Sequence, residues 1–156
     1  GCTMLVRSEA AKAAVPFCPY MVHDHYIALC CSAAEDIYSI TRPMIHYRVH
    51  GRNQTGVMAG VQDKASYRRE RIDLPLHKFQ WLEQHFPYRE EFREEISLRR
   101  EWMYARQSNW NRHGGARTVW KRRKLSPLAS LFELSARWFP ERVLMWVIHL
   151  TQKNVI

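Results

Sequence analysis

Residues 23–34 read HDHYIALCCSAA, and this stretch sets the fold expected for the first third of the chain. Apolar residues dominate it after His25, which predicts a helix that is buried on most of its faces. Asp24 is a favoured N-cap residue, and we expect it to cap the start of this helix. Capping is the simplest role for Asp24. The flanking side chains nevertheless make His23, Asp24 and His25 a candidate polar cluster at the mouth of the helix.

Segments rich in β-forming residues come after this helix. Ile37–Ile40 and Met44–Arg48 follow it on either side of a turn and predict two short strands. A loop containing three residues typical of turns, Gly51, Asn53 and Gly56, comes next. Residues 1–60 are therefore expected to form a mixed α/β structure.

A second polar cluster leaves the last of these strands. Arg48, His50 and Arg52 alternate along the chain, so on an extended backbone their side chains share one face. Basic groups beside glycine-rich backbone amides suit a diphosphate. A plain basic surface loop explains this segment equally well when it is taken alone.

The order of the segments GCTMLVR, HDHYIALCCSAA and RPMIHYRVHGRNQTG is more specific than any one of them. It resembles the C-terminal part of the catalytic domain in bacterial family 2 glycosyltransferases of the rhamnosyltransferase-like branch. There an H-D-aromatic motif opens a helix, and a segment P-L-x-x-Y-R-x-H-G-x-N-x-x-G returns under the active site. Seven positions of that segment are matched here: Pro43, Tyr47, Arg48, His50, Gly51, Asn53 and Gly56. One departure is His25, where the family commonly has Trp or Tyr.

The resemblance implies the C-terminal portion of a GT-A domain, an α/β fold with few short strands, over the acceptor-side residues 1–60. Residues 1–6 would form a strand at the floor of the acceptor side. A mostly helical, basic tail would occupy residues 61–156. The implied reaction is inverting transfer of a sugar from a nucleoside-diphosphate donor to a saccharide or lipid-linked saccharide, as in cell-envelope polysaccharide synthesis.

The same resemblance assigns the site residues. Asp24 would be the general base that deprotonates the acceptor hydroxyl. His23, His25 and Asn53 would bind substrate. Arg48 and His50 would also bind it, by neutralising the departing diphosphate, and His50 would be an extra ligand to a divalent Mg²⁺ or Mn²⁺ ion.

Two parts of such an enzyme are missing from this sequence. No Asp-x-Asp triplet, the main metal motif of the family, occurs in it, and no nucleotide-binding βαβ half precedes the HDH motif. The chain also opens on Gly1 rather than Met. We therefore expect a fragment that lacks the donor-binding half and is inactive alone.

Helical spacing dominates after about residue 62. Apolar residues recur at that spacing from Leu76 to Phe86, between two prolines, and again along an Arg/Glu-rich stretch from Tyr88 to Met103. Residues 111–115 predict a break, Ser126-Pro127 predicts the start of another helix, and a last segment follows Pro140. Helices packed on one another are the simplest explanation of these apolar stripes.

The positive charge of the chain is concentrated in its middle. The formal net charge is +9, and residues 64–124 hold 16 basic but only 8 acidic side chains. Such an excess suggests an anionic partner or a solvated helix face rich in Arg. Tryptophans accompany the basic residues, and this combination suits peripheral attachment to an anionic membrane surface. They are Trp102, Trp110, Trp120, Trp138 and Trp146.

Several classes are excluded or less favoured. The longest apolar run, residues 143–148, is far shorter than the roughly 20 residues that span a bilayer. No secretory signal opens the chain, and its four cysteines form no disulfide framework. We expect a cytoplasmic protein, attached peripherally to the inner face of the plasma membrane. The rival is a small nucleic-acid-binding helical protein that uses residues 110–124, although it shows no recognised module motif. A helical adaptor is a third reading.

Overall fold

The computed structural model describes residues 3–46, 48, 58 and 60–153, and within these ranges all regular structure is helical. The helices before residue 60 are α1 (Ser8–Ala13) and α2 (His23–Ala34). A second group follows: α3 (Lys64–Arg68), the π-helical turn η1 (Arg69–Asp73), α4 (Leu74–His85), α5 (Arg93–Trp110), α6 (Ala116–Lys121), the 3-10 turn η2 (Arg123–Leu125), α7 (Pro127–Ala136) and α8 (Glu141–Lys153).

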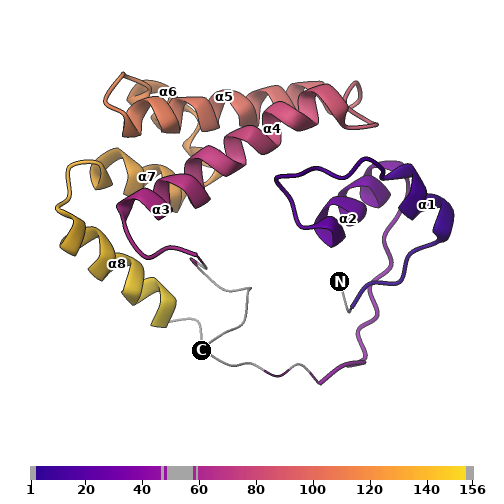
Figure 1. Ribbon diagram of the computed structural model, residues 1–156. Coiled ribbons are helices and arrows are strands. Elements are labelled where there is room, and N and C mark those ends of the chain that lie inside the picture. The colour runs from indigo at the N-terminus through magenta and orange to yellow at the C-terminus, as the bar shows by residue number, and fades with distance from the viewer. Residues whose placement is uncertain (1–2, 47, 49–57, 59, 154–156) are drawn as a thin grey trace.

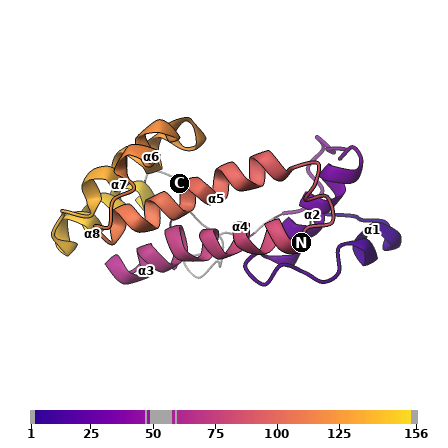
Figure 2. The same cartoon turned by 90° about the horizontal axis from the view of Figure 1, so that it is seen from above.

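The second group forms a helical body, residues 64–153. Helix α4 packs along α5. Helices α6 and α7 also pack on α5, and α8 contacts α3. Figure 1 shows α4 and α5 crossing the top of the molecule, with α6 to α8 at one end and α1 and α2 at the other. Figure 2, seen from above, shows α4 and α5 side by side.

The expected α/β fold is wrong for the described residues, because none of them lies in a strand. Ile37–Ile40, residues 44–46 and residues 4–6 have no regular structure where strands were predicted. Their composition favours β structure, but a strand is stable only where a neighbouring strand pairs with its backbone groups and a core covers one face. The described chain supplies neither for these segments.

Pro75 lies in the first turn of α4, within a longer continuous helical run. Helices α3 and α4 join through η1 into one helical run from Lys64 to His85. A proline at position 75 cannot donate the usual hydrogen bond to the carbonyl of Arg71, four residues earlier, and its ring crowds that carbonyl. The π-helical turn lies at this place, and the Arg71 carbonyl accepts instead from Nη2 of Arg106, at 2.8 Å.

Other predicted boundaries are confirmed. Helix α7 begins at Pro127 after the N-cap Ser126, α8 follows Pro140, and a break separates α5 from α6. Within that break Gly114 and Gly115 have φ of +98° and +87°. A Cβ on Gly115 would lie 2.2 Å from the carbonyl oxygen of Ala105, so only glycine fits this close approach of the turn to α5.

Two hydrophobic clusters stabilise the fold. The first joins α2 and the loop before it to α4 and α5, through Tyr26, Cys30, Leu82 and their neighbours. The second lies between α3, α7 and α8, around Tyr67 and Leu144. The first cluster therefore holds α2 against the helical body.

A buried polar network connects α5, α7 and α3 beside the second cluster. Arg106 is 4% exposed and Glu133 is fully buried. Arg106 donates from Nε to Oε2 of Glu133 at 2.7 Å and from Nη2 to Oε1 of the same carboxylate. The hydroxyl of Tyr67 donates to that carboxylate at 2.9 Å. These bonds satisfy a buried charge pair that would otherwise be costly.

Candidate functional site

The predicted cluster of His23, Asp24 and His25 occupies the first turn of α2. Val22 is the N-cap residue, so the expectation that Asp24 caps the helix is wrong. Asp24 lies one position inside the helix, and its Oδ1 accepts the backbone N–H of His25 at 2.8 Å. Both histidines are exposed, and Asp24 is half-buried. The three side chains therefore stand at an open helix end.

The buried side of α2 holds this end in place. Tyr26 and Cys30 are the buried residues of the helix. The Tyr26 ring meets Trp81 and Phe86 edge to face, with centroid distances of 5.5 and 6.4 Å. Such pairs add specific geometry to the burial of the rings. The His-Asp-His turn is thus presented by a helix whose other side is fixed to α4.

Helix α2 is less buried than its composition predicts. Ile27, Ala28 and Leu29 are only partly covered, although nearly every residue in this part of the helix is apolar. The prediction assumed that each apolar face would meet a neighbour. Within the described residues the neighbours lie on the α4 side, and the remaining faces stay partly open.

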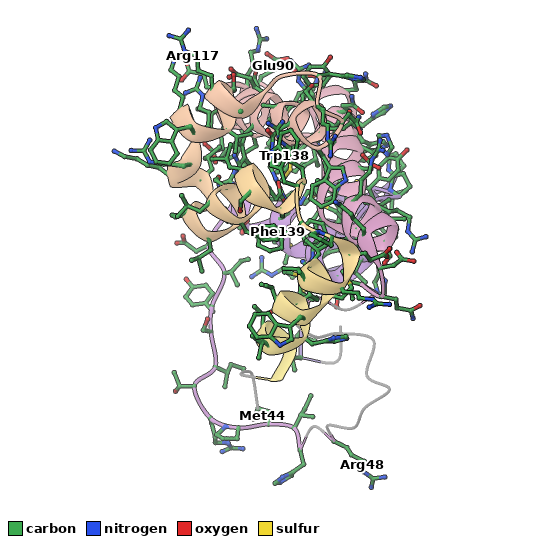
Figure 3. The ribbon with its side chains drawn as sticks, turned by 90° about the vertical axis from the view of Figure 1, so that its left-hand side faces the viewer. Met44, Arg48, Glu90, Arg117, Trp138 and Phe139 are labelled. Atoms are coloured by element: carbon green, nitrogen blue, oxygen red, sulfur yellow. The ribbon has the colours of Figure 1, made fainter. Side chains whose placement is uncertain are left out.

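Most of the second predicted cluster lies outside the described residues, namely His50, Arg52 and Asn53. Arg48 is described and exposed. Figure 3 shows its side chain at the foot of the extended segment, beyond Met44 and directed away from the helices. That Asp24 faces Arg48 and His50 across a cleft stays a prediction.

The sequence predicted only one ligand of a metal site, His50, because the Asp-x-Asp motif is absent. Among residues 3–46, 48, 58 and 60–153, no three His, Cys, Asp or Glu side chains gather where they could hold an ion. His50, the residue expected to bind Mg²⁺ or Mn²⁺, lies outside the described residues, so the metal site stays a prediction.

A basic surface lies at the opposite end of the body, over the turn before α6, over α6 itself and over η2. Five of its residues are Arg112, Arg117, Lys121, Arg123 and Lys124, and no acidic residue occurs between Glu101 and Glu133. Figure 3 shows Arg117 projecting from the edge of the body. This surface carries no acidic residue of its own and is far along the chain from α2.

Exposed tryptophans accompany these basic residues. Arg123 stacks over Trp120 at 4.4 Å and Arg112 over Trp138 at 4.5 Å. Trp120, Trp138 and Trp146 are 51%, 60% and 63% exposed. Two other tryptophans that we expected at the surface are not available there. Trp102 is buried, and Trp110 stacks on Tyr67 in the second hydrophobic cluster.

Sequence reasoning missed the charged pair Arg106–Glu133, although a signal for Arg106 was present. Ile96 and Met103 mark the apolar stripe of α5, and Arg106 continues that stripe one turn later. An arginine on a buried stripe requires a buried acceptor. Glu133 supplies this acceptor from 27 residues later in the chain, and a separation of that size gives no local pattern from which the partner could be identified.

Comparison with protein-family models, with curated proteins and with solved structures finds no match to this chain. Within its described part, no helix is long and apolar enough to span a membrane. The functional argument therefore rests on the motifs and on the geometry of the sites themselves.

Proposed function

We propose that this chain is the acceptor-side part of an inverting glycosyltransferase that uses a nucleoside-diphosphate sugar. The observation that carries the proposal is the His-Asp-His turn at the open end of α2. It combines a half-buried carboxylate with two exposed imidazoles on a helix anchored by Tyr26. A catalytic group needs both solvent or substrate access and a rigid support.

Asp24 is the general base of the proposed reaction. Its carboxylate would accept the proton of the acceptor hydroxyl as that oxygen attacks the anomeric carbon and the bond to the diphosphate breaks. His23 and His25 are its neighbours in the sequence and would hydrogen-bond the acceptor sugar. Arg48 and His50 would neutralise the negative charge that grows on the departing diphosphate.

The exposure of the segment between α2 and α3 supports a larger catalytic unit. Tyr38, Ile40 and Met44 are 90%, 75% and 64% exposed, in a stretch rich in β-forming residues. Contiguous apolar side chains of this kind mark a surface that another part of a protein covers. The donor-binding half of a GT-A domain would supply a sheet for these residues to join.

Attachment to an anionic membrane surface is a second part of the proposal. Val143, Trp146 and Leu150 form an exposed stripe on α8, and Arg142 and His149 lie beside it. Helices of this composition lie in the membrane interface, and nearby basic residues add attraction to anionic lipids. This location would bring a cytoplasmic enzyme to a lipid-linked acceptor on the inner face of the plasma membrane.

The catalytic assignment is tested in a chain extended by its upstream coding sequence, which should contain a βαβ half with an Asp-x-Asp motif. Asp24→Asn should reduce sugar transfer by about 10²–10⁴-fold, the usual contribution of a general base. The matched control is Asp36→Asn, an exposed aspartate just after α2. The 156 residues alone should neither transfer nor hydrolyse the donor sugar. Full activity of Asp24→Asn would reject the assignment.

Membrane attachment is tested by co-sedimentation with vesicles. Binding should rise with the fraction of anionic lipid and fall with added salt. Trp146→Ser should weaken it, whereas Ile40→Ser, which removes an even more exposed apolar side chain elsewhere, should not. Binding that is independent of anionic lipid would contradict this part of the proposal.

Nucleic-acid binding is the alternative function, and the acid-free stretch between Glu101 and Glu133 is the observation in its favour. A nucleic-acid interface would bind oligonucleotides with a steep salt dependence and would lose affinity on Trp120→Ala. The exposed apolar residues Leu128 and Leu131 next to this basic surface favour the membrane instead, because nucleic acids offer them no apolar partner.

A further inference from the structure

A pocket of about 400 Å³ lies where α2, α4 and α5 meet, away from the His-Asp-His turn. Its walls are apolar: Leu29 and Ala33 come from the second half of α2, Phe79 and Leu82 from α4, and Ile96 from α5. This volume falls within the range of small-molecule pockets, which are mostly apolar with a few polar groups at defined places.

Charged side chains stand at the rim of this pocket: Lys78, Glu95 and Arg99. Arg99 donates from Nε to Oε1 of Glu95, so these two charges neutralise one another. Lys78 has no such partner. Its ammonium group lies 4.7 Å from the centre of the Phe79 ring and forms no hydrogen bond or ion pair with any residue that the structure describes.

Lys78 is also partly withdrawn from water. Burial lowers the pKa of its ammonium group, since the charged form loses hydration. An anion at this place would restore the lost interaction. Lys124 of the basic surface is exposed and does not line this pocket.

We propose that this pocket binds a single-chain amphiphile with an anionic head, such as an alkyl carboxylate or an alkyl phosphate. The chain would lie against Leu29, Leu82 and Ile96, and the head would pair with the Lys78 ammonium. A neutral hydrocarbon would leave Lys78 unpaired, and a nucleotide would place polar groups against the apolar walls. No lining residue belongs to the proposed catalytic turn, so this inference does not depend on the proposed function.

The test is calorimetric titration of the 156-residue chain below the critical micelle concentrations of the probes. Dodecanoate and dodecyl phosphate should each bind with one-to-one stoichiometry. Dodecyl maltoside, with the same chain and a neutral head, should bind at least about tenfold more weakly, as expected for loss of a charge-assisted interaction. If dodecyl phosphate bound more tightly than dodecanoate, the natural ligand would carry a phosphate head. If the two bound equally, the pocket would accept any anionic head.

Three variants sharpen the test. Lys78→Met keeps the length of the side chain without its charge and should weaken both anions about tenfold while leaving the maltoside unchanged. Ala33→Phe should abolish binding of all three probes by filling the pocket. Lys124→Met, at an exposed site far from the pocket, should bind like the unmodified chain. Unchanged thermal unfolding would show that each variant is folded.

Two results would overturn the inference. If the maltoside bound as tightly as the anions, or if Lys78→Met kept full affinity for them, the pocket would recognise only an apolar chain. If no probe bound to the folded chain, the pocket would instead be covered by another polypeptide segment.

Discussion

Large apolar side chains are exposed in the segment between α2 and the helical body, whereas most of those between the helices of the body are buried. In residues 35–46 the large apolar residues are exposed, with Tyr38 at 90%. In the body, residues of the same types are buried between helices, and Leu144 and Ile72 are fully covered. Both regions have apolar sequences, so composition alone does not decide burial. A helix satisfies its own backbone and needs only a neighbour for one face, whereas an extended segment also needs a partner for its backbone.

The largest expected effect is the loss of the buried charge pair in the body. Glu133→Gln leaves the Arg106 guanidinium buried without a counter-charge, and we expect it to lower the free energy of unfolding by about 3–5 kcal/mol. Urea unfolding followed by circular dichroism measures this change.

The matched control for Glu133→Gln is Glu90→Gln, which removes the exposed pair between Glu90 and Arg93. Exposed pairs contribute about 0–1 kcal/mol, so this variant should unfold almost like the unmodified chain. Equal effects of the two variants would mean that the Arg106 site is open to water.

The next comparison places one apolar truncation in each region. Leu144→Ala should lower the free energy of unfolding by about 2–5 kcal/mol, because it removes buried methyl groups and leaves a cavity. Ile40→Ala removes a side chain that is 75% exposed and should change the free energy by less than about 0.5 kcal/mol. A large loss for Ile40→Ala would show that residues 35–46 pack on the body.

Adjacent glycines in the turn between α5 and α6 allow a finer comparison within the body. Gly115→Ala should lower the free energy of unfolding by more than about 2 kcal/mol, since its Cβ would meet the Ala105 carbonyl and its φ is positive. Gly114→Ala meets no atom within 4 Å and carries only the strain of a positive φ, about 1–2 kcal/mol. Thermal unfolding of both variants ranks the two effects, and a reversed order would contradict the close packing of this turn.

The smallest expected effect is a pH dependence at the start of the body. Hydrogen bonds from the Ser66 backbone and side chain lower the pKa of the Asp63 carboxyl in the capping box of α3. Because the folded pKa lies below the unfolded one, the stabilisation is complete above the ordinary pKa of an aspartate, near 4, and is lost as pH falls through the folded pKa. Asp63→Asn should flatten this acid-side slope in unfolding measured from pH 6 to 3, and an unchanged slope would contradict the assignment.

The sequence predicted correctly those helix ends and breaks that depend on residues close together in the chain. A helix ending at Ala34, the start of α7 at Ser126-Pro127 and the break at residues 111–115 follow from spacing, a cap and glycines, and all three are confirmed. The N-cap at Asp24 failed by two residues, because Val22 precedes the helix and Asp24 falls within its first turn. The composition of the candidate turn was thus predictable, although the exact place of its carboxylate was not.

Contacts between distant residues could not be predicted in this way. Pro75 removes one of the usual helical hydrogen bonds, and Arg106, 31 positions later in the chain, donates to the carbonyl that the proline leaves without its usual partner. The rim of the pocket is a similar case. Lys78 looks like any exposed lysine in the sequence, and only the packing of α2 against α4 and α5 places it beside an apolar pocket without an acidic partner.

By itself the sequence determined where the main helices of the body lie and where the positive charge gathers, because these depend on neighbours within a few positions. Tertiary structure alone decided that the β-forming segments stay without a sheet in the described chain, that Arg106 meets Glu133 and that Trp110 turns inward. Burial and backbone pairing depend on what lies opposite in space, and that is set by the packing of the whole chain.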